Sequence, residues 1–203
     1  MIKSQSSIHF IHANFKDVEK KLKSYDLLGK VNCILADLGF SSMQIDNPER
    51  GFTYKFDGPL DMRMDVSCSL TAAEFLQTVD ESDLTSILQE NSDEVYAQAI
   101  AHAIKSHPIP QTTLQLADCV RKTYQSQGKS PTKDAINPII ARTMQAIRIA
   151  VNGEFQALES LLEALPRILA PNGRAVILTF HSGEDRRVKK AFKEGFAAGV
   201  YTN

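Results

Sequence analysis

The sequence predicts an α/β fold with an all-helical insertion, and two patterns carry this prediction. Apolar runs at 31–36 (VNCILA) and 175–180 (AVILTF) have the length and composition of buried parallel strands. Residues 71–124, which lie between these runs, contain helix signals only. Strands that alternate with helices along a chain imply a parallel sheet, so the helical block is interpreted as an insertion into it.

The first part of the chain is expected to hold two strands and one helix. Residues 8–11 predict a short strand, and 15–28 predict an amphipathic helix. The buried run at 31–36 ends at Asp37. Residues 38–65 carry turn signals and almost no periodicity, and they are rich in aromatic side chains. Long irregular segments in compact domains are usually functional or disordered, and the aromatic content favours an ordered, functional loop.

The helical block begins with a capping box, in which Thr71 is followed three residues later by Glu74. Asp80, Asp93 and Thr113 mark further helix starts. Residues 121–133 hold four basic residues together with Gly, Ser and Pro, and no acidic residue, which predicts a mobile loop.

A long helical pattern resumes at residue 141. Its apolar positions recur every three or four residues, which predicts a stripe that faces the core, at Ile147, Val151, Phe155, Leu158, Leu162, Leu165 and Leu169. Asn152 and Gly153 interrupt the pattern, so two helices are expected. A turn is predicted at 171–173, and a basic helix is expected to begin near 186, after the second buried strand.

Composition excludes several classes of protein. The chain has 203 residues, of which 43% are hydrophobic and 23% charged, with a net charge of −1, as in an ordinary globular protein. The closest two of its ten glycines are four residues apart, so neither a G-x-G-x-x-G turn nor a Walker loop lies within it.

The cysteines and the N-terminus indicate a compartment. Cys33, Cys68 and Cys119 are odd in number and widely spaced, which argues against a disulfide framework or a zinc site and favours a reducing environment. No signal core or membrane span is evident. We therefore expect no membrane association, and a cytoplasmic location or, in a eukaryote, an organellar matrix.

Three polar or aromatic residues follow the predicted strands. In an open α/β sheet, ligands bind beyond the carboxyl ends of the strands, where Phe15, Asp37 and His181 would lie. Asp37 could accept a hydrogen bond from an amine or hydroxyl, or it could simply cap a helix or turn. His181 could face a ligand, although Ser182 with Asp185 already explains a helix start at this point.

Residues 50–65 alternate cations with aromatic rings, which suits an unstacked base and its phosphates. A half-buried strand with its rings inward would give the same pattern. A basic run such as 186–190 is usually a solvated helix face, but its position beside a strand end would allow phosphate contact.

Several long motifs resemble one family in their order along the chain. They are DLGFSSMQID at 37–46, RGF at 50–52, GPLDMRMD at 58–65, RTMQAIRI at 142–149 and TFHSGEDR at 179–186. This combination resembles the MraW/RsmH family, whose members are S-adenosylmethionine-dependent methyltransferases of the N4 amine of a cytosine in small-subunit ribosomal RNA.

The resemblance implies a class I, Rossmann-like methyltransferase sheet with two core parts, 1–66 and 141–203, around a helical insertion at 67–140. It implies S-adenosylmethionine contacts at Phe15, Asp37 and Gln44, and it makes Asp37 the catalytic residue. Its partner would be small-subunit ribosomal RNA or the assembling subunit. As a hypothesis of our own, RNA-facing roles fall to Arg50, Phe52, Arg63, Arg142, His181 and Arg186.

Members of that family begin with a glycine-rich D-x-T-x-G-x-G-G-H loop, and no such loop precedes residue 8. The family's C-terminal segment also has no counterpart. We therefore expect an incomplete sheet in a fragment, a chain with a mis-called start or an alternative product of a longer gene, with an irregular N-terminal region. The alternatives to an enzyme are a truncated, non-catalytic RNA-binding remnant and a product without a stable fold.

Overall fold

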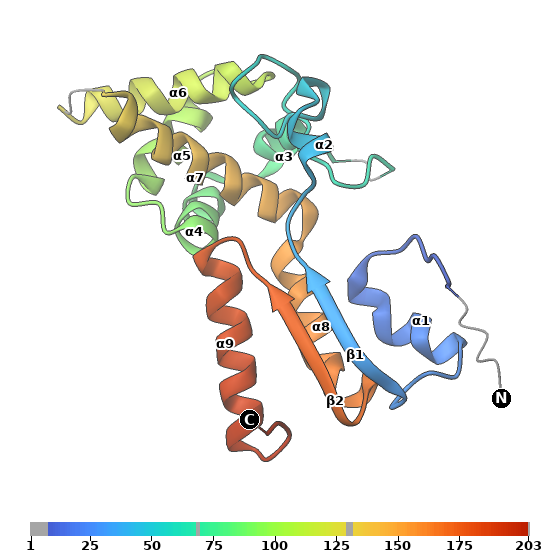
Figure 1. Cartoon of the computed structure of the whole chain (residues 1–203). Coiled ribbons are helices and arrows are strands. Elements are labelled where there is room, and N and C mark those ends of the chain that lie inside the picture. Colours follow the sequence, from blue (N-terminus) through green and yellow to red (C-terminus); the bar gives the residue numbers. More distant parts are fainter. Residues whose placement is uncertain (1–7, 68–69, 129–131, 203) are drawn as a thin grey trace.

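The computed structural model describes residues 8–67, 70–128 and 132–202, and in these ranges the protein is a mixed α/β molecule (Figure 1). Two 3-10 turns lie at Phe15–Asp17 and Pro48–Arg50. The regular elements are α1 Val18–Ser24, β1 Val31–Asp37, α2 Ser42–Ile45, α3 Ala72–Thr78, α4 Glu81–Ser92, α5 Ala97–Ser106, α6 Thr113–Ser126, α7 Lys133–Asn152, α8 Glu154–Ile168, β2 Leu169–Leu178 and α9 Ser182–Ala197.

The sheet of the described residues consists of β1 and β2, which pair in parallel. Ile34 lies opposite Ala175, and Asp37 lies opposite Leu178. The ladder is interrupted near its start, because residues 170–173 of β2 loop out of register. The turn predicted at 171–173 is therefore an irregularity within β2.

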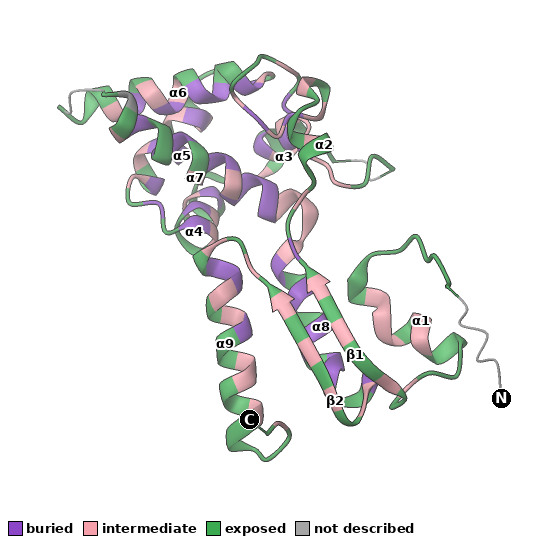
Figure 2. Cartoon of the chain, in the orientation of Figure 1, coloured by how far each residue is buried: buried purple, intermediate pink, exposed green. Residues whose placement is uncertain are grey.

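One face of this sheet is covered. Side chains that alternate along both strands pack with α8 and α9 in one apolar cluster, which we call the sheet cluster. Its fully buried members are Leu38, Leu158, Leu161, Leu162, Leu165 and Val188. On the other face Leu35, Val176 and Leu178 are exposed, and Figure 2 shows both strands striped in this way.

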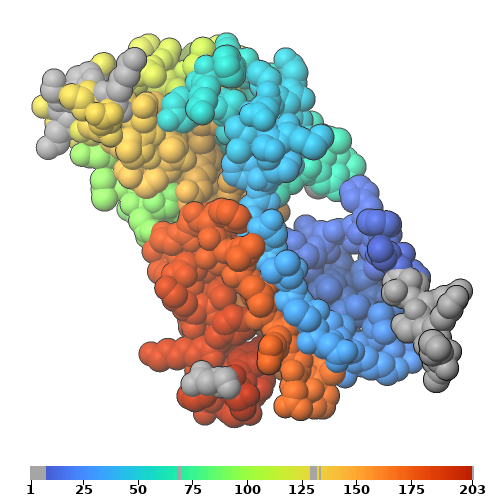
Figure 3. Space-filling model, viewed as in Figure 1, coloured from blue at the N-terminus to red at the C-terminus, as the bar shows by residue number. Residues whose placement is uncertain are grey.

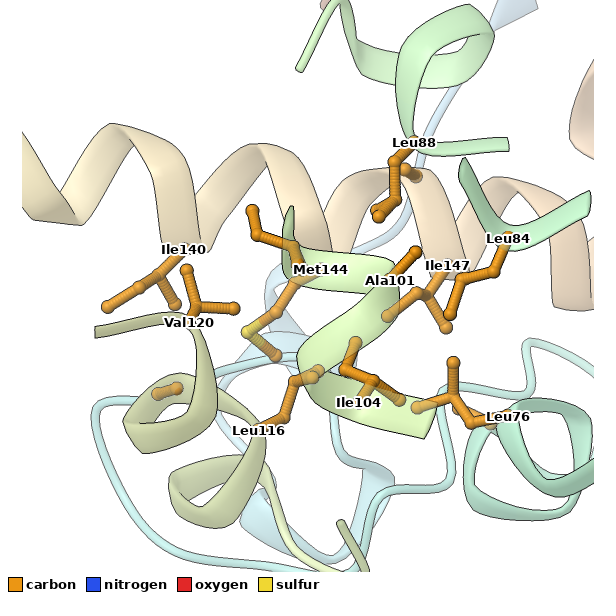
Figure 4. Packing of buried hydrophobic residues seen from close by; sticks show 14 of the residues in the cluster. Leu76, Leu84, Leu88, Ala101, Ile104, Leu116, Val120, Ile140, Met144 and Ile147 are labelled. Carbon is orange, nitrogen blue, oxygen red and sulfur yellow. The ribbon is translucent and has the colours of Figure 1, made fainter. Parts of the chain in front are cut away.

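The helical block has a larger core, which we call the helical cluster. It is built from α3 to α7, and Figure 4 shows Leu76, Leu84, Ile104 and Leu116 converging on the α7 side chain Ile147. In the space-filling view, the light-blue segment after β1 connects this block to the layer that contains the sheet (Figure 3). The boundary expected after residue 140 falls inside α7, and the domain division stays a prediction.

Two sequence signals for helix ends are confirmed. The Glu74 carboxylate accepts hydrogen bonds from the backbone N–H and the hydroxyl of Thr71, at 2.8 and 2.7 Å, which completes the capping box of α3. Gly153 ends α7 with φ of +60°, a left-handed conformation that glycine adopts without strain. The predicted break between α7 and α8 is therefore correct.

Several predicted boundaries are wrong. Residues 8–11 form no strand, because no described strand pairs with them and an unpaired strand leaves its backbone groups unsatisfied. This matches the expected irregular N-terminal region. The helix predicted over 15–28 is a 3-10 turn followed by α1, which ends at Ser24. Asp93 ends α4 in a left-handed conformation, and α5 begins later, at Ala97.

The helix start near residue 113 is capped by Thr112, whose hydroxyl accepts from the N–H of Gln115. The mobile loop predicted over 121–133 is wrong over its first part, because α6 continues to Ser126. Thr123 is buried there, and Tyr124 packs against the helical cluster, so tertiary contacts override the local composition.

Residues 129–131 lie outside the described residues, as does Cys68. Of the other two cysteines, Cys33 is exposed on β1, and both are free. Across the described part of the chain, no helix has the length and apolarity needed to cross a membrane.

Candidate functional site

The carboxyl ends of the two strands lie side by side. Asp37 is the last residue of β1 and pairs with Leu178, the last residue of β2. The N–H of Leu38 donates to the carbonyl of Leu178 at 3.3 Å, which holds the two chains together as they leave the sheet. Such an edge is where ligands bind in open α/β sheets, as expected from the sequence.

A cavity of about 460 Å³ opens at this edge, between the sheet and α7. Its lining includes Phe52 and Lys55 from the loop after β1, Arg148 from α7, and Phe180 and His181 from the loop after β2. Ligand pockets for small molecules commonly measure about 300–1,000 Å³, so the cavity has room for a group such as a nucleobase.

Four side chains form a column along the cavity. The rings of Phe40 and Phe52 stack with centroids 5.2 Å apart and an angle of 17° between their planes. The Arg148 guanidinium lies 4.4 Å from the Phe40 centroid, and that of Arg50 lies 5.8 Å from the Phe52 centroid. Cations over ring faces are attracted electrostatically, so the column ties α7 to the loop after β1.

Arg148 is also held from the side of α8. Its guanidinium donates to both carboxylate oxygens of Glu154, at 2.8 and 3.0 Å, and both side chains are nearly buried. Burial raises the pKa of Glu154, against the opposing effect of Arg148. This forked pair fixes one wall of the cavity.

Glu184 organises the loop after β2. Its buried carboxylate accepts the N–H of Phe180 at 2.8 Å, and its Oε1 lies 3.3 Å from Nε2 of His181. Burial would raise the pKa of Glu184, but the adjacent His181 ring and the hydrogen bond from the N–H of Phe180 outweigh it and lower the pKa. The His181 side chain is 12% exposed, and its Nδ1 has no hydrogen-bond partner among the described residues.

The three residues with expected S-adenosylmethionine contacts are only partly brought together. Phe15 lines a second, smaller cavity of about 50 Å³ that shares Leu38 with the larger one. Asp37 directly precedes Leu38 in the chain and is exposed. Gln44 instead caps α2, where its Oε1 accepts from the N–H of Ser41 at 2.8 Å.

A group of the size of S-adenosylmethionine therefore exceeds the cavity beside Phe15 alone. The aromatic ring of Phe15 and the carboxylate of Asp37 suit its adenine and its cationic parts, and the adjoining larger cavity offers the remaining space. The residues present fit part of this group.

The arginines expected to face RNA all have partners within the chain. Arg50 donates to the carbonyls of Arg63 and Met64, at 2.7 and 3.1 Å. Arg63 forms a forked pair with Asp61, at 2.9 and 2.7 Å. These contacts fold the loop after β1 upon itself, and an RNA-facing role for either arginine remains a prediction.

The other two arginines pair across elements. Arg142 donates to the buried carboxylate of Glu94 at 2.8 Å. Arg186 donates to both oxygens of Asp93, at 2.9 and 3.1 Å, and thereby links α9 to the end of α4. Neither reaches the lining of the large cavity, whereas Phe52 and His181 do.

Sequence reasoning missed the roles of Arg148, Glu184 and Asn152. The side-chain NH₂ of Asn152 donates to the carbonyls of Met62 and Arg148, both at 2.8 Å, and its oxygen accepts the N–H of Met64 at 2.7 Å. Arg148 and Glu184 lie in the motifs that carry the family resemblance, and Asn152 follows the motif 142–149. Met62 and Met64, the partners of Asn152, are distant in the chain, so local patterns held no signal for these contacts.

The fold and the site define a mixed α/β protein with many helices between its two parallel strands and a cavity at the carboxyl ends of those strands. The chain belongs to the MraW methylase family, whose model matches residues 1–200.

Similar proteins include two that are named ribosomal RNA small subunit methyltransferase H 1. The protein of Agathobacter rectalis is 46% identical over 195 residues, which cover 94% of this chain and 55% of that protein. The protein of Lachnoclostridium phytofermentans is 45% identical over 193 residues, which cover 93% of this chain and 52% of that protein. The chain thus spans about half the length of the curated relatives it matches.

Proposed function

We propose that the chain acts in the methylation of the N4 amine of a cytosine in small-subunit ribosomal RNA, with S-adenosylmethionine as the methyl donor. The observation that carries this is the position of Asp37 at the end of β1, directly before Leu38 in the lining of a cavity with room for a nucleobase, in a member of the MraW methylase family. The names of the relatives support the substrate. We accordingly propose that the protein works in the compartment in which small ribosomal subunits are assembled.

The cytosine N4 amine is a poor nucleophile, because its lone pair is delocalised into the ring. S-adenosylmethionine would supply a methyl group on a sulfonium, which leaves as the neutral thioether when the methyl passes directly to N4, so no covalent intermediate with the protein would be required. Asp37 would accept a hydrogen bond from N4, which raises electron density on the nitrogen and holds it in line. Phe15 and the backbone after Asp37 would position the donor.

The sheet would belong to a class I, Rossmann-like methyltransferase, with β1 and β2 as neighbouring strands. The parallel pairing, the helical crossover between the strands and the ligand cavity at their carboxyl ends support this assignment.

The Asp37→Ala variant tests the proposal. We expect methyl transfer from radiolabelled S-adenosylmethionine to small-subunit RNA to fall at least about 100-fold, because a positioned proton acceptor commonly contributes that much. The thermal unfolding midpoint should stay unchanged, because Asp37 is exposed and its side chain forms no hydrogen bond within the described residues. Asp46→Ala, an exposed carboxylate nearby, is the matched control. Wild-type rates in Asp37→Ala would contradict the assignment.

Calorimetry separates catalysis from binding. Heat on addition of S-adenosylmethionine supports the enzyme, whereas RNA binding without any such heat at millimolar concentration would favour a non-catalytic RNA-binding role.

A further inference from the structure

We propose that Phe180 is the stacking platform for an unstacked pyrimidine base at the mouth of the large cavity. The inference rests on the proposed function and adds a residue that contacts the substrate. It assigns recognition to an aromatic face on the loop after β2, outside the segment 50–65 that the sequence indicated.

The other rings of the cavity have little free surface. Phe40 stacks with Phe52 and has the Arg148 guanidinium over its ring, and Arg50 approaches the ring of Phe52. Tyr54 packs against the helical cluster, and its hydroxyl lies 3.4 Å from the carbonyl of Asn137. These three rings are therefore already engaged by other side chains of the protein.

Phe180 differs from these rings. It lines the cavity, its side chain is 69% exposed, and among the described residues it has no aromatic or cationic contact. Base stacking on exposed aromatic rings is the usual means of holding single-stranded RNA. One exposed ring is ordinary on a protein surface, so the inference depends on where this ring is held and what surrounds it.

The backbone of Phe180 is anchored, and its ring is uncovered on the side of Gly39. Its N–H donates to the buried Glu184 carboxylate at 2.8 Å, which anchors its backbone. Its ring lies 3.6 Å from the point where a Cβ on Gly39 would stand, and Gly39 has φ of +89°, so no side chain covers the ring from there. Gly39 is two residues beyond Asp37, so the ring lies close to the segment that follows the carboxyl end of β1.

Polar groups are available for the edge of a stacked base. His181 follows Phe180, lines the same cavity, and keeps a buried Nδ1 without a hydrogen-bond partner among the described residues. Enzymes that modify a base read its edge by hydrogen bonds while aromatic side chains hold its face. Phe180, His181 and Asp37 together provide a face, an edge contact and an amine acceptor.

RNA binding by Phe180 variants of the 203-residue chain tests the proposal. The probe is a short fluorescein-labelled single-stranded RNA that contains one cytosine, followed by anisotropy. We expect Phe180→Ala and Phe180→Leu to weaken binding about tenfold to hundredfold, and Phe180→Tyr to bind as the wild type does. Wild-type affinity in Phe180→Ala, or in Phe180→Leu, would overturn the stacking role, since leucine keeps the apolar surface and lacks the ring.

A tryptophan reporter gives a second measurement. The chain has no tryptophan, so Phe180→Trp introduces a single one. Its fluorescence should be quenched by the RNA and by cytidine monophosphate, whereas that of Phe196→Trp, an exposed position on α9, should not. Unquenched Phe180→Trp in the presence of bound RNA would contradict the proposal.

The two proposals can fail separately. Loss of RNA affinity in the Phe180 variants, without methyl transfer by the unaltered chain, would leave the platform standing and refute the catalytic function. Methyl transfer by the unaltered chain, with unchanged RNA affinity in the Phe180 variants, would support the catalytic function and refute the platform. Absence of RNA binding by the unaltered chain would overturn both proposals.

Discussion

At the scale of residues, the Glu184 carboxylate both holds the loop after β2 and contributes to the free energy of unfolding. The carboxylate is buried, and its pKa is lower in the folded protein because the adjacent His181 ring and the hydrogen bond from Phe180 outweigh the effect of burial. A carboxylate whose pKa is depressed by folding contributes stability that is present above its unfolded pKa and lost as the pH falls through the folded value.

We therefore expect Glu184→Gln to lower the free energy of unfolding by about 1–3 kcal/mol at pH 7, since the amide keeps an acceptor but loses the charge. The difference from the wild type should shrink as the pH falls below the unfolded pKa of about 4.3 and through the lowered folded pKa, below which both proteins present an uncharged group. Urea unfolding at a series of pH values measures it. Glu90→Gln, an exposed position on α4, is the control, and a difference that stays constant down to pH 3 would contradict the mechanism.

At the scale of elements, the loop between β1 and α3 is built by close backbone approach. Gly51 ends the 3-10 turn Pro48–Arg50 with φ of +71°. A Cβ at this position would lie 2.5 Å from the carbonyl oxygen of Pro59 and 2.7 Å from the backbone nitrogen of Asp61. The carbonyl of Arg50 also accepts the N–H of Met62 at 3.0 Å, so the two arms of the loop cannot move apart without breaking this hydrogen bond.

Gly51→Ala is expected to lower the free energy of unfolding by at least about 2 kcal/mol, through the unfavourable φ together with the clash against backbone atoms. Gly29→Ala is a matched control, because Gly29 has φ of +68° but nothing within 4 Å of its Cβ position. It should cost only about 1 kcal/mol. Denaturant unfolding of both variants checks this, and equal losses would show that conformational strain alone decides.

The elements that could be predicted from the sequence are those whose signals are local. Both buried strands, the capping box of Thr71 and Glu74, and the break at Gly153 depend on short stretches of sequence, and all are present. The strand at 8–11 could not be judged in this way, because a strand forms only when another pairs with it. Similarly, α6 runs into a basic segment because Thr123 is buried by distant helices.

In the candidate site, too, local signals could be predicted from the sequence, whereas contacts between distant residues could not. The position of Asp37 at a strand end followed from the pattern and is confirmed, whereas its part in the site stays a prediction, because the lining of the cavity begins with the next residue, Leu38. The stacking of Phe52 on Phe40 and the pairs that occupy Arg142 and Arg186 depend on side chains brought together by the fold. The charged and aromatic motifs thus identified the region of the site. The structure shows which side chains of these motifs are engaged by partners within the protein.

At the scale of the whole molecule, the two apolar clusters are unequal. Among the described residues the helical cluster has nineteen fully buried members, whereas the sheet cluster has six. The sheet is covered on one face, and Leu35, with 67% of its surface exposed, lies on the other. Parallel sheets are usually covered on both faces, so β1 and β2 have less apolar support than strands in such sheets commonly have.

Regions with few buried apolar contacts open at a lower free energy than the rest of a protein. We therefore expect native-state hydrogen exchange to show the amides of β1 and β2 opening about 2 kcal/mol below those of α4 and α7. Leu165→Ala, in the sheet cluster, should cost about 2–5 kcal/mol and lower the protection of the strands while that of α4 persists. Leu76→Ala, equally buried in the helical cluster, should lower the protection of α4 and α7. If either substitution lowers the protection of all these elements by the same amount, the two clusters unfold as one cooperative unit and the expectation is wrong.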